Sequence, residues 1–271
     1  MTAVALPQSR DLRSVADGAL GAAAGLWFTV ALIGQWAFVY YIANFYGPST
    51  LSGNFHAWSR NTNLVKGYVA GDTAGNVFFG VHALLDAVIA FGGALQLVPR
   101  IRRRAIIVHR WNGRLFMLTA LGVAFSGLYL IWVRGSSPTF LGALATSLNG
   151  FLIIACVALA WRAALGRDIA AHRRWALRAY LVANGQWFFR VGVFAVAVLD
   201  RKLVEPFFML WGFGCTLAPL AVLEIYLHTR ERGGPGGRLA MAGGLVVLSG
   251  LTALGILGVY LAMWRPLLGG A

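Results

Sequence analysis

Three ionisable side chains, Asp86, Arg190 and Glu224, lie inside long apolar stretches, and any chemistry in this chain has to start from them. A charge at the centre of a membrane helix costs about 2.5–3.5 kcal/mol on insertion scales, so each should face a partner or water. Asp86 and Arg190 each lie about ten residues from the outer end of a predicted span, which is about 15 Å deep. The sequence therefore predicts an ion pair between Asp86 and Arg190, whose simplest role is to lock two helices together.

Other polar residues extend this pair into a stripe. His82 precedes Asp86 by one helical turn and shares its face, and Gln96 follows further along the same stretch. Such a stripe could carry protons, coordinate a metal or haem, or hold a polar substrate. The simpler interpretation of His82 is a hydrogen-bonded packing residue. The predicted polar membrane cluster consists of His82, Asp86, Gln96 and Arg190.

A second group of polar residues is expected at the opposite, inner surface. Glu224 lies near the inner end of its span, at the level of two short basic motifs that each contain a histidine. An ion pair with Arg114 or Arg178 would explain Glu224, and a functional site with the two histidines is the alternative. This inner-face cluster consists of His109, Arg114, His172, Arg178 and Glu224.

The elements that position these side chains are membrane spans. Of the 271 residues, 59% are hydrophobic and only 12% are charged, whereas soluble proteins carry about 25% charged residues. Stretches of about 20 apolar residues, each long enough to cross a bilayer, recur along the chain. We predict an all-α integral membrane protein with a polar segment at 1–19 and a single transmembrane domain at 20–265. Seven helices are expected at about 20–45, 76–98, 113–134, 140–165, 177–199, 207–228 and 239–263.

The distribution of arginine predicts the orientation. The net charge is +14, and the arginines concentrate in the loops at 99–114, 166–176 and 229–238, whereas the long loop at 47–75 is poor in them. Because basic loops stay in the cytoplasm, we expect a cytoplasmic N-terminus and an outer C-terminus. The same loops are expected to contact anionic lipid headgroups, and nucleic acid is not an expected partner.

Small residues within the spans have packing explanations. Cys156 and Cys215 both lie in apolar stretches, so a disulfide framework is not expected. Glycines at close spacing favour tight helix crossings. They include Gly21, Gly25, Gly244, Gly250, Gly255 and Gly258.

Four motifs together resemble a known family. They are Gly80-Val81-His82, Gly92-Gly93-Ala94-Leu95-Gln96-Leu97-Val98-Pro99-Arg100, His109-Arg110-Trp111-Asn112-Gly113-Arg114 and Asp168-Ile169-Ala170-Ala171-His172-Arg173-Arg174-Trp175. Over about 76–228 the chain is similar to a bacterial family of predicted membrane proteins, domain-of-unknown-function family 2306, which also tends to place an arginine and a glutamate at Arg190 and Glu224. The resemblance implies a multi-pass protein of the bacterial inner membrane and no established activity.

Three functions stay open at this point. The chain is a non-catalytic membrane component of unknown activity, a haem b-binding redox protein, or a proton-coupled transporter that uses Asp86 and Arg190. His109 and His172 would be the haem ligands, because b-type cytochromes clamp iron between imidazoles of different helices, and His82 is a further candidate ligand. The sequence contains no zinc-protease helix, serine elbow, phosphate loop or Rossmann glycine pattern in a usable context, so enzymatic activity is not expected.

Overall fold

The apolar stretches form helices long enough to cross a bilayer, as seen in a computed structural model that describes residues 8–62 and 66–269. In these two ranges the chain is helical, without a β-strand. Six helices have the length and apolarity of a span, and a bent pair of shorter helices makes a possible seventh. The six are α1 (Gln8–Leu51), α2 (Thr73–Leu97), α4 (Ile106–Trp132), α5 (Phe140–Leu165), α8 (Val204–Arg232) and α9 (Pro235–Val259).

Much of the predicted inner loop at 99–114 is helical. It contains α3 (Pro99–Arg104) and the first turns of α4, because proline is favoured at the first helical position and arginine is a good helix former. The outer loop at 47–75 contains the last residues of α1 and the short helix η1 (Phe55–Arg60), whose Trp58 is fully buried. The other short elements are η2 (Arg201–Leu203), the π-helical turn η3 (Tyr260–Trp264) and α10 (Arg265–Gly269).

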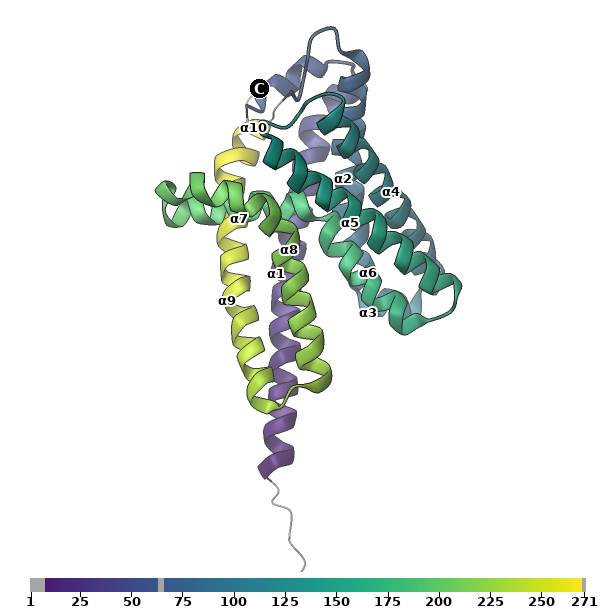
Figure 1. Cartoon of the computed structure of the whole chain (residues 1–271), viewed down its shortest axis with the longest axis vertical. Coiled ribbons are helices and arrows are strands. Elements are labelled where there is room, and N and C mark those ends of the chain that lie inside the picture. Colours follow the sequence, from purple (N-terminus) through teal and green to yellow (C-terminus); the bar gives the residue numbers. More distant parts are fainter. Residues whose placement is uncertain (1–7, 63–65, 270–271) are drawn as a thin grey trace, which may run out of the picture.

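The predicted span at 177–199 is not one helix. It is divided into α6 (Ile169–Ala183) and α7 (Gly185–Leu199), which meet at Asn184 with a bend of 55°. Asn184 ends α6, because its backbone N–H donates to the carbonyl oxygens of Leu181 and Tyr180 at 3.2 and 3.3 Å and its side-chain Nδ2 donates to Tyr180 at 2.8 Å. The single helix expected at 177–199 is therefore two helices, which together can still form one broken span, and α7 runs across the molecule instead of continuing α6 (Figure 1).

Two groups of helices flank this break. Figure 1 shows α2, α4, α5 and α6 together on one side, and α1, α8 and α9 on the other. The two long helices α1 and α9 pack along one another, and α7 crosses α9.

Two glycines of α9 allow α7 to cross it at close range. A Cβ atom on Gly255 would lie 2.1 Å from the backbone oxygen of Val191, and one on Gly258 would lie 3.0 Å from that of Phe194. The expectation of tight crossings is confirmed at these two glycines. It is wrong at the four others, because a Cβ added there would have no neighbour within 4 Å; these are Gly21, Gly25, Gly244 and Gly250.

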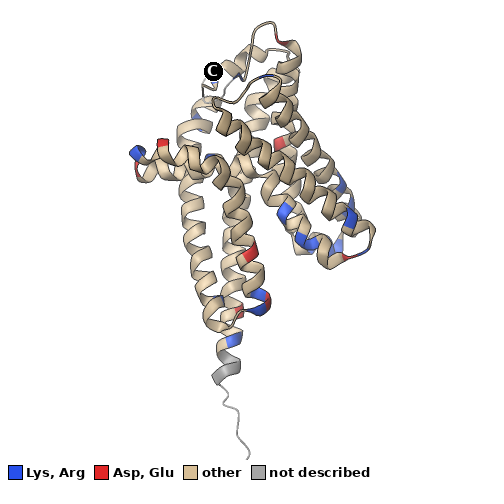
Figure 2. Cartoon of the chain, in the orientation of Figure 1, with Lys and Arg blue, Asp and Glu red and all other residues tan. Residues whose placement is uncertain are grey.

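Basic residues gather at one end of the helix bundle. Figure 2 shows them around α3, the start of α6 and the connection between α8 and α9. Arg238 at the start of α9 is ion-paired with Asp17 of α1. The three predicted basic loops therefore lie on the same side of the molecule, as expected for a chain that crosses the membrane several times.

Candidate functional site

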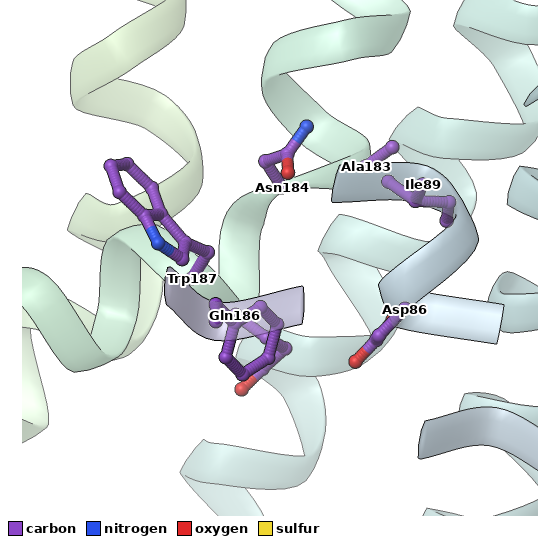
Figure 3. A pocket seen from close by; sticks show the side chains of 7 residues that line it. Asp86, Ile89, Ala183, Asn184, Gln186 and Trp187 are labelled. Carbon is purple, nitrogen blue, oxygen red and sulfur yellow. The ribbon is translucent and has the colours of Figure 1, made fainter. Parts of the chain in front are cut away.

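A small cavity lies beside the break between α6 and α7 (Figure 3). The space open to the centre of a water molecule is about 10 Å³, close to the least that holds one water. The cavity combines one carboxylate and two amide side chains with apolar walls. Its lining residues are Phe38, Asp86, Ile89, Ala183, Asn184, Gln186 and Trp187.

Asn149 on α5 stabilises the break. Its Nδ2 donates to the carbonyl oxygen of Val182 at 2.9 Å, and also to Thr216 Oγ1 on α8 at 2.9 Å. Gly185 makes room for this side chain, since a Cβ there would lie 2.6 Å from Asn149 Nδ2. A backbone carbonyl in a bilayer must find a partner inside the protein, so Asn149 makes the interrupted helix tolerable.

Asp86 and Arg190 approach this region from different helices without touching. In the described ranges Asp86 has no hydrogen bond and no ion pair within 4.0 Å. Arg190 Nη1 donates to the carbonyl oxygen of Gln186 at 2.9 Å, and its guanidinium lies over the ring of Phe38 at 5.5 Å from the centroid. The predicted Asp86–Arg190 ion pair is not formed, because the bend at Asn184 directs α7 across the molecule.

The other two members of the predicted membrane cluster face α4. His82 Nδ1 lies 2.9 Å from Ser126 Oγ, which itself donates to the carbonyl oxygen of Gly122. Gln96 Nε2 donates to the carbonyl oxygen of His109 at 3.0 Å. The packing interpretation of His82 therefore fits its contacts. Asp86 is the only member of that cluster that lines the cavity.

The inner-face cluster is built around one strong ion pair. Arg178 on α6 binds Glu224 on α8 with two hydrogen bonds, from Nε at 2.7 Å and from Nη2 at 2.9 Å. Its guanidinium also lies 4.6 Å from the ring centroid of Trp175. Arg114 stacks on Trp111 instead. Of the two pairings that the sequence left open, the structure forms the one with Arg178.

The two histidines of the inner face have different environments. His172 Nδ1 donates to the carbonyl oxygen of Ala160 at 2.9 Å, whereas the buried Nδ1 of His109 has no hydrogen-bond partner in the described chain. Residues 8–62 and 66–269 contain no group of three or more His, Cys, Asp or Glu side chains placed to hold a metal ion. Haem ligation by His109 and His172, or by His82, stays a prediction.

Several uncharged residues at or beside the cavity were not predicted from the sequence. Gln35 lies on α1, one turn before the cavity residue Phe38, and is fully buried. It accepts a hydrogen bond from Tyr180 on α6 at 2.8 Å. Asn149, Asn184 and Trp187 were also missed. Asn149 and Asn184 could have been predicted, because an asparagine within an apolar stretch needs a hydrogen-bond partner inside the protein.

An ion pair outside the spans was missed as well. Asp72 caps α2, where it accepts hydrogen bonds from Gly75 N and from Arg134 Nε, both at 2.8 Å. The backbone hydrogen bond and then Arg134 lower the pKa of Asp72 below its usual value. Arg134 also donates to Asn76 Oδ1 at 2.6 Å, so this group fastens the end of α4 to the start of α2.

Comparison with known proteins identifies one family. Residues 79–227 match DUF2306, described as a predicted membrane protein, and this match spans more than half of the chain. It includes α4, α5, α6 and α7, together with most of α2 and α8. No curated protein and no solved structure matches the chain.

Proposed function

Since the chain belongs to DUF2306, a family of predicted membrane proteins of unknown function, we propose that it is a proton-coupled transporter in which Asp86 binds the proton. The observation that carries this proposal is the position of Asp86 beside the break between α6 and α7, with no ion pair within 4.0 Å in the described residues. Ionisable residues inside spans tend to mark ion pathways. Transporters often form their sites at interrupted helices.

The arrangement of Arg190 supports the same proposal. A carboxylate locked in a buried ion pair gives up its partner only at high cost. Here the guanidinium is held by Gln186 and Phe38 and forms no ion pair with Asp86. A coupling residue must gain and lose a proton in each transport cycle. Asp86 can do so without breaking a salt bridge.

Replacing Asp86 by asparagine is expected to abolish proton uptake. Asparagine keeps the size of the side chain and removes its proton-binding group. The assay uses vesicles containing the purified protein and a trapped pH-sensitive dye, with a potassium diffusion potential, in the presence and absence of a panel of amino acids, sugars and small carboxylates. The wild type should acidify the vesicles faster than Asp86→Asn, whose rate should equal that of protein-free vesicles.

A matched control is Glu205→Gln, which removes an exposed carboxylate at the start of α8 and should keep the wild-type rate. Equal uptake by Asp86→Asn and the wild type would contradict the proposal. The absorption spectrum of the same preparation tests the alternative function. A Soret band that is lost in His109→Ala or His172→Ala would support a haem protein instead.

We further propose that the N-terminus is cytoplasmic, that the membrane is the bacterial inner membrane, and that the basic side contacts anionic headgroups. The clustering of arginine at one end of the bundle supports the orientation and the headgroup contact (Figure 2), whereas the bacterial inner membrane is what the family resemblance implies. In intact spheroplasts an impermeant maleimide should label Asn54→Cys and not Gly236→Cys, whereas the reverse would refute the orientation. The native cysteines are buried. Binding to anionic vesicles should weaken as the salt concentration rises.

A further inference from the structure

A second, larger pocket lies at the opposite end of α2 from the basic segment α3. It opens between the last residues of α4 and the loop that leads into α2, and its volume is about 400 Å³. Small-molecule sites in proteins have volumes of about 300–1,000 Å³, so this pocket has room for a ligand. Its lining residues are Lys66, Val69, Asp72, Tyr129, Val133 and Arg134.

The ammonium group of Lys66 carries a charge that no carboxylate neutralises. Lys66 Nζ donates to the carbonyl oxygen of Arg134 at 2.8 Å, and both residues line the pocket. Among the described residues it forms no ion pair within 4.0 Å and no second hydrogen bond. An ammonium group has three donors, so two of them are free to bind a ligand.

Two unusual backbone conformations hold this ammonium group in place. Lys66 has a φ of +53°, which is uncommon for a residue other than glycine. Gly135 has a φ of +66°, and a Cβ added there would lie 3.1 Å from Lys66 Nζ. Gly135 therefore leaves the space beside which the ammonium group lies. Left-handed conformations of residues other than glycine cluster at functional sites, which agrees with a binding role for Lys66.

The other two charges of the pocket cancel one another. Arg134 is buried, and its Nε lies 2.8 Å from Asp72 Oδ2. Its Nη2 donates to Asn76 Oδ1 at 2.6 Å, so the guanidinium is already bound to protein groups. The pocket is therefore left with one positive charge, that of Lys66, and is matched by a ligand group with one negative charge.

Beside this charge the pocket has apolar walls that continue onto the surface of the spans. Val133 at the end of α4 is exposed. The ring of Tyr129 stacks on Phe78 of α2 at 4.2 Å between centroids, and Phe78 is exposed as well. Because α2 and α4 are candidate spans, apolar side chains exposed on them face the hydrocarbon tails of the lipid. A ligand in this pocket thus meets a cation and a lipid-facing surface together.

We propose that this pocket binds the phosphate group of a membrane phospholipid, to which Lys66 Nζ donates hydrogen bonds. A phosphodiester carries one negative charge, whereas a phosphate monoester carries about 1.5 to 2 at neutral pH, so the pocket matches the diester of a phospholipid better. Basic pockets between membrane helices are known to bind lipid headgroups. The hydrocarbon chains then lie along Phe78, Tyr129 and Val133. This site does not depend on whether Asp86 binds a proton.

Chemical labelling of lysine tests the proposal in the unaltered protein. The sequence contains two lysines, Lys66 and Lys202, and both are exposed, so acetylation of each can be followed by mass spectrometry of the digested protein. Lys202 lies on η2 and does not line the pocket, which makes it an internal control. Dioleoylphosphatidylglycerol added to the delipidated protein in detergent should slow the acetylation of Lys66 several-fold and leave that of Lys202 unchanged.

Further probes separate the two parts of the ligand. Dioleoylglycerol has the same hydrocarbon chains without a phosphate, and it should not protect Lys66. Inorganic phosphate and glycerophosphoglycerol have no hydrocarbon chains, and at the same concentration they should protect Lys66 much less than the phospholipid does.

A matched pair of variants measures the contribution of the charge. Lys66→Gln should raise the phospholipid concentration that half-saturates the first bound lipid, measured by native mass spectrometry, by about tenfold or more, the usual loss on removing a charged hydrogen-bond donor. Lys202→Gln should leave it unchanged. If Lys66→Gln does not fold, the labelling of the wild type still decides.

Three results would overturn the proposal. Equal slowing of both lysines by the phospholipid would show a general coating of the protein and no site at Lys66. Equal protection by dioleoylglycerol would show that the pocket takes hydrocarbon without a phosphate. Equal protection by inorganic phosphate would assign the pocket to a soluble anion and not to a lipid.

Discussion

Replacing Gly255 by alanine is expected to cause the largest loss of stability of any single methyl group added to this protein. The added carbon would lie 2.1 Å from the backbone oxygen of Val191, and a backbone atom cannot move aside as the end of a side chain can. The helices α7 and α9 would have to separate. Overpacking of this kind costs about 1–3 kcal/mol and occasionally more, and we expect about 3 kcal/mol or more here. Thermal unfolding of the purified protein in detergent measures the change.

Gly250→Ala provides the control on the same helix. A Cβ at Gly250 has no neighbour within 4 Å, so the substitution adds the same atom without a clash. Its effect should stay within about 0.5 kcal/mol, as for most surface substitutions. Equal destabilisation by the two alanines would show that the crossing of α7 and α9 is not what holds this part of the molecule.

Replacing Asn149 by leucine is expected to produce the second large effect. Leucine has a similar branched shape but is bulkier, and the carbonyl oxygen of Val182 and the hydroxyl of Thr216 lose the donor that each has at 2.9 Å. Leaving buried polar groups unpaired costs about 1–3 kcal/mol, and we expect about 2 kcal/mol in the free energy of unfolding. Because Val182 immediately precedes the cavity residues Ala183 and Asn184, proton uptake by vesicles should also fall.

Thr146→Val is a suitable comparison for Asn149→Leu. Thr146 lies less than one turn earlier on α5, and its hydroxyl donates only to the carbonyl oxygen of Gly142 in the same helix. This variant should retain both stability and uptake. If Asn149→Leu behaves like Thr146→Val, the break at Asn184 is maintained without Asn149.

Properties that depend on local sequence were predicted well. The expected spans at about 76–98 and 140–165 agree closely with α2 and α5, because the length of an apolar stretch is a local property. The break at Asn184 depends on Asn149, which is distant in sequence, and on the space that Gly185 leaves for it. The hydropathy of residues 177–199 therefore could not predict the break.

The contacts of the candidate site were predicted only in part. Counting residues placed Asp86 and Arg190 at similar depths, but the bend at Asn184 decides where Arg190 points. The ion pair of Glu224 with Arg178 was among the expected pairings, since the sequence placed both residues near the inner ends of their predicted spans. Trp187 gave no sequence signal, because a tryptophan in an apolar stretch usually needs no explanation beyond packing.

The contacts of α9 have a consequence for the order in which the molecule is completed. Residues that line the cavity come from α1, α2, α6, α7 and the connection between the last two, so the ribosome delivers all of them before it reaches Pro235. The helix that packs along α1 and crosses α7 comes after them. The cavity residues on α1 and α7 are therefore all synthesised before the long helix that packs against both of these elements in the finished molecule.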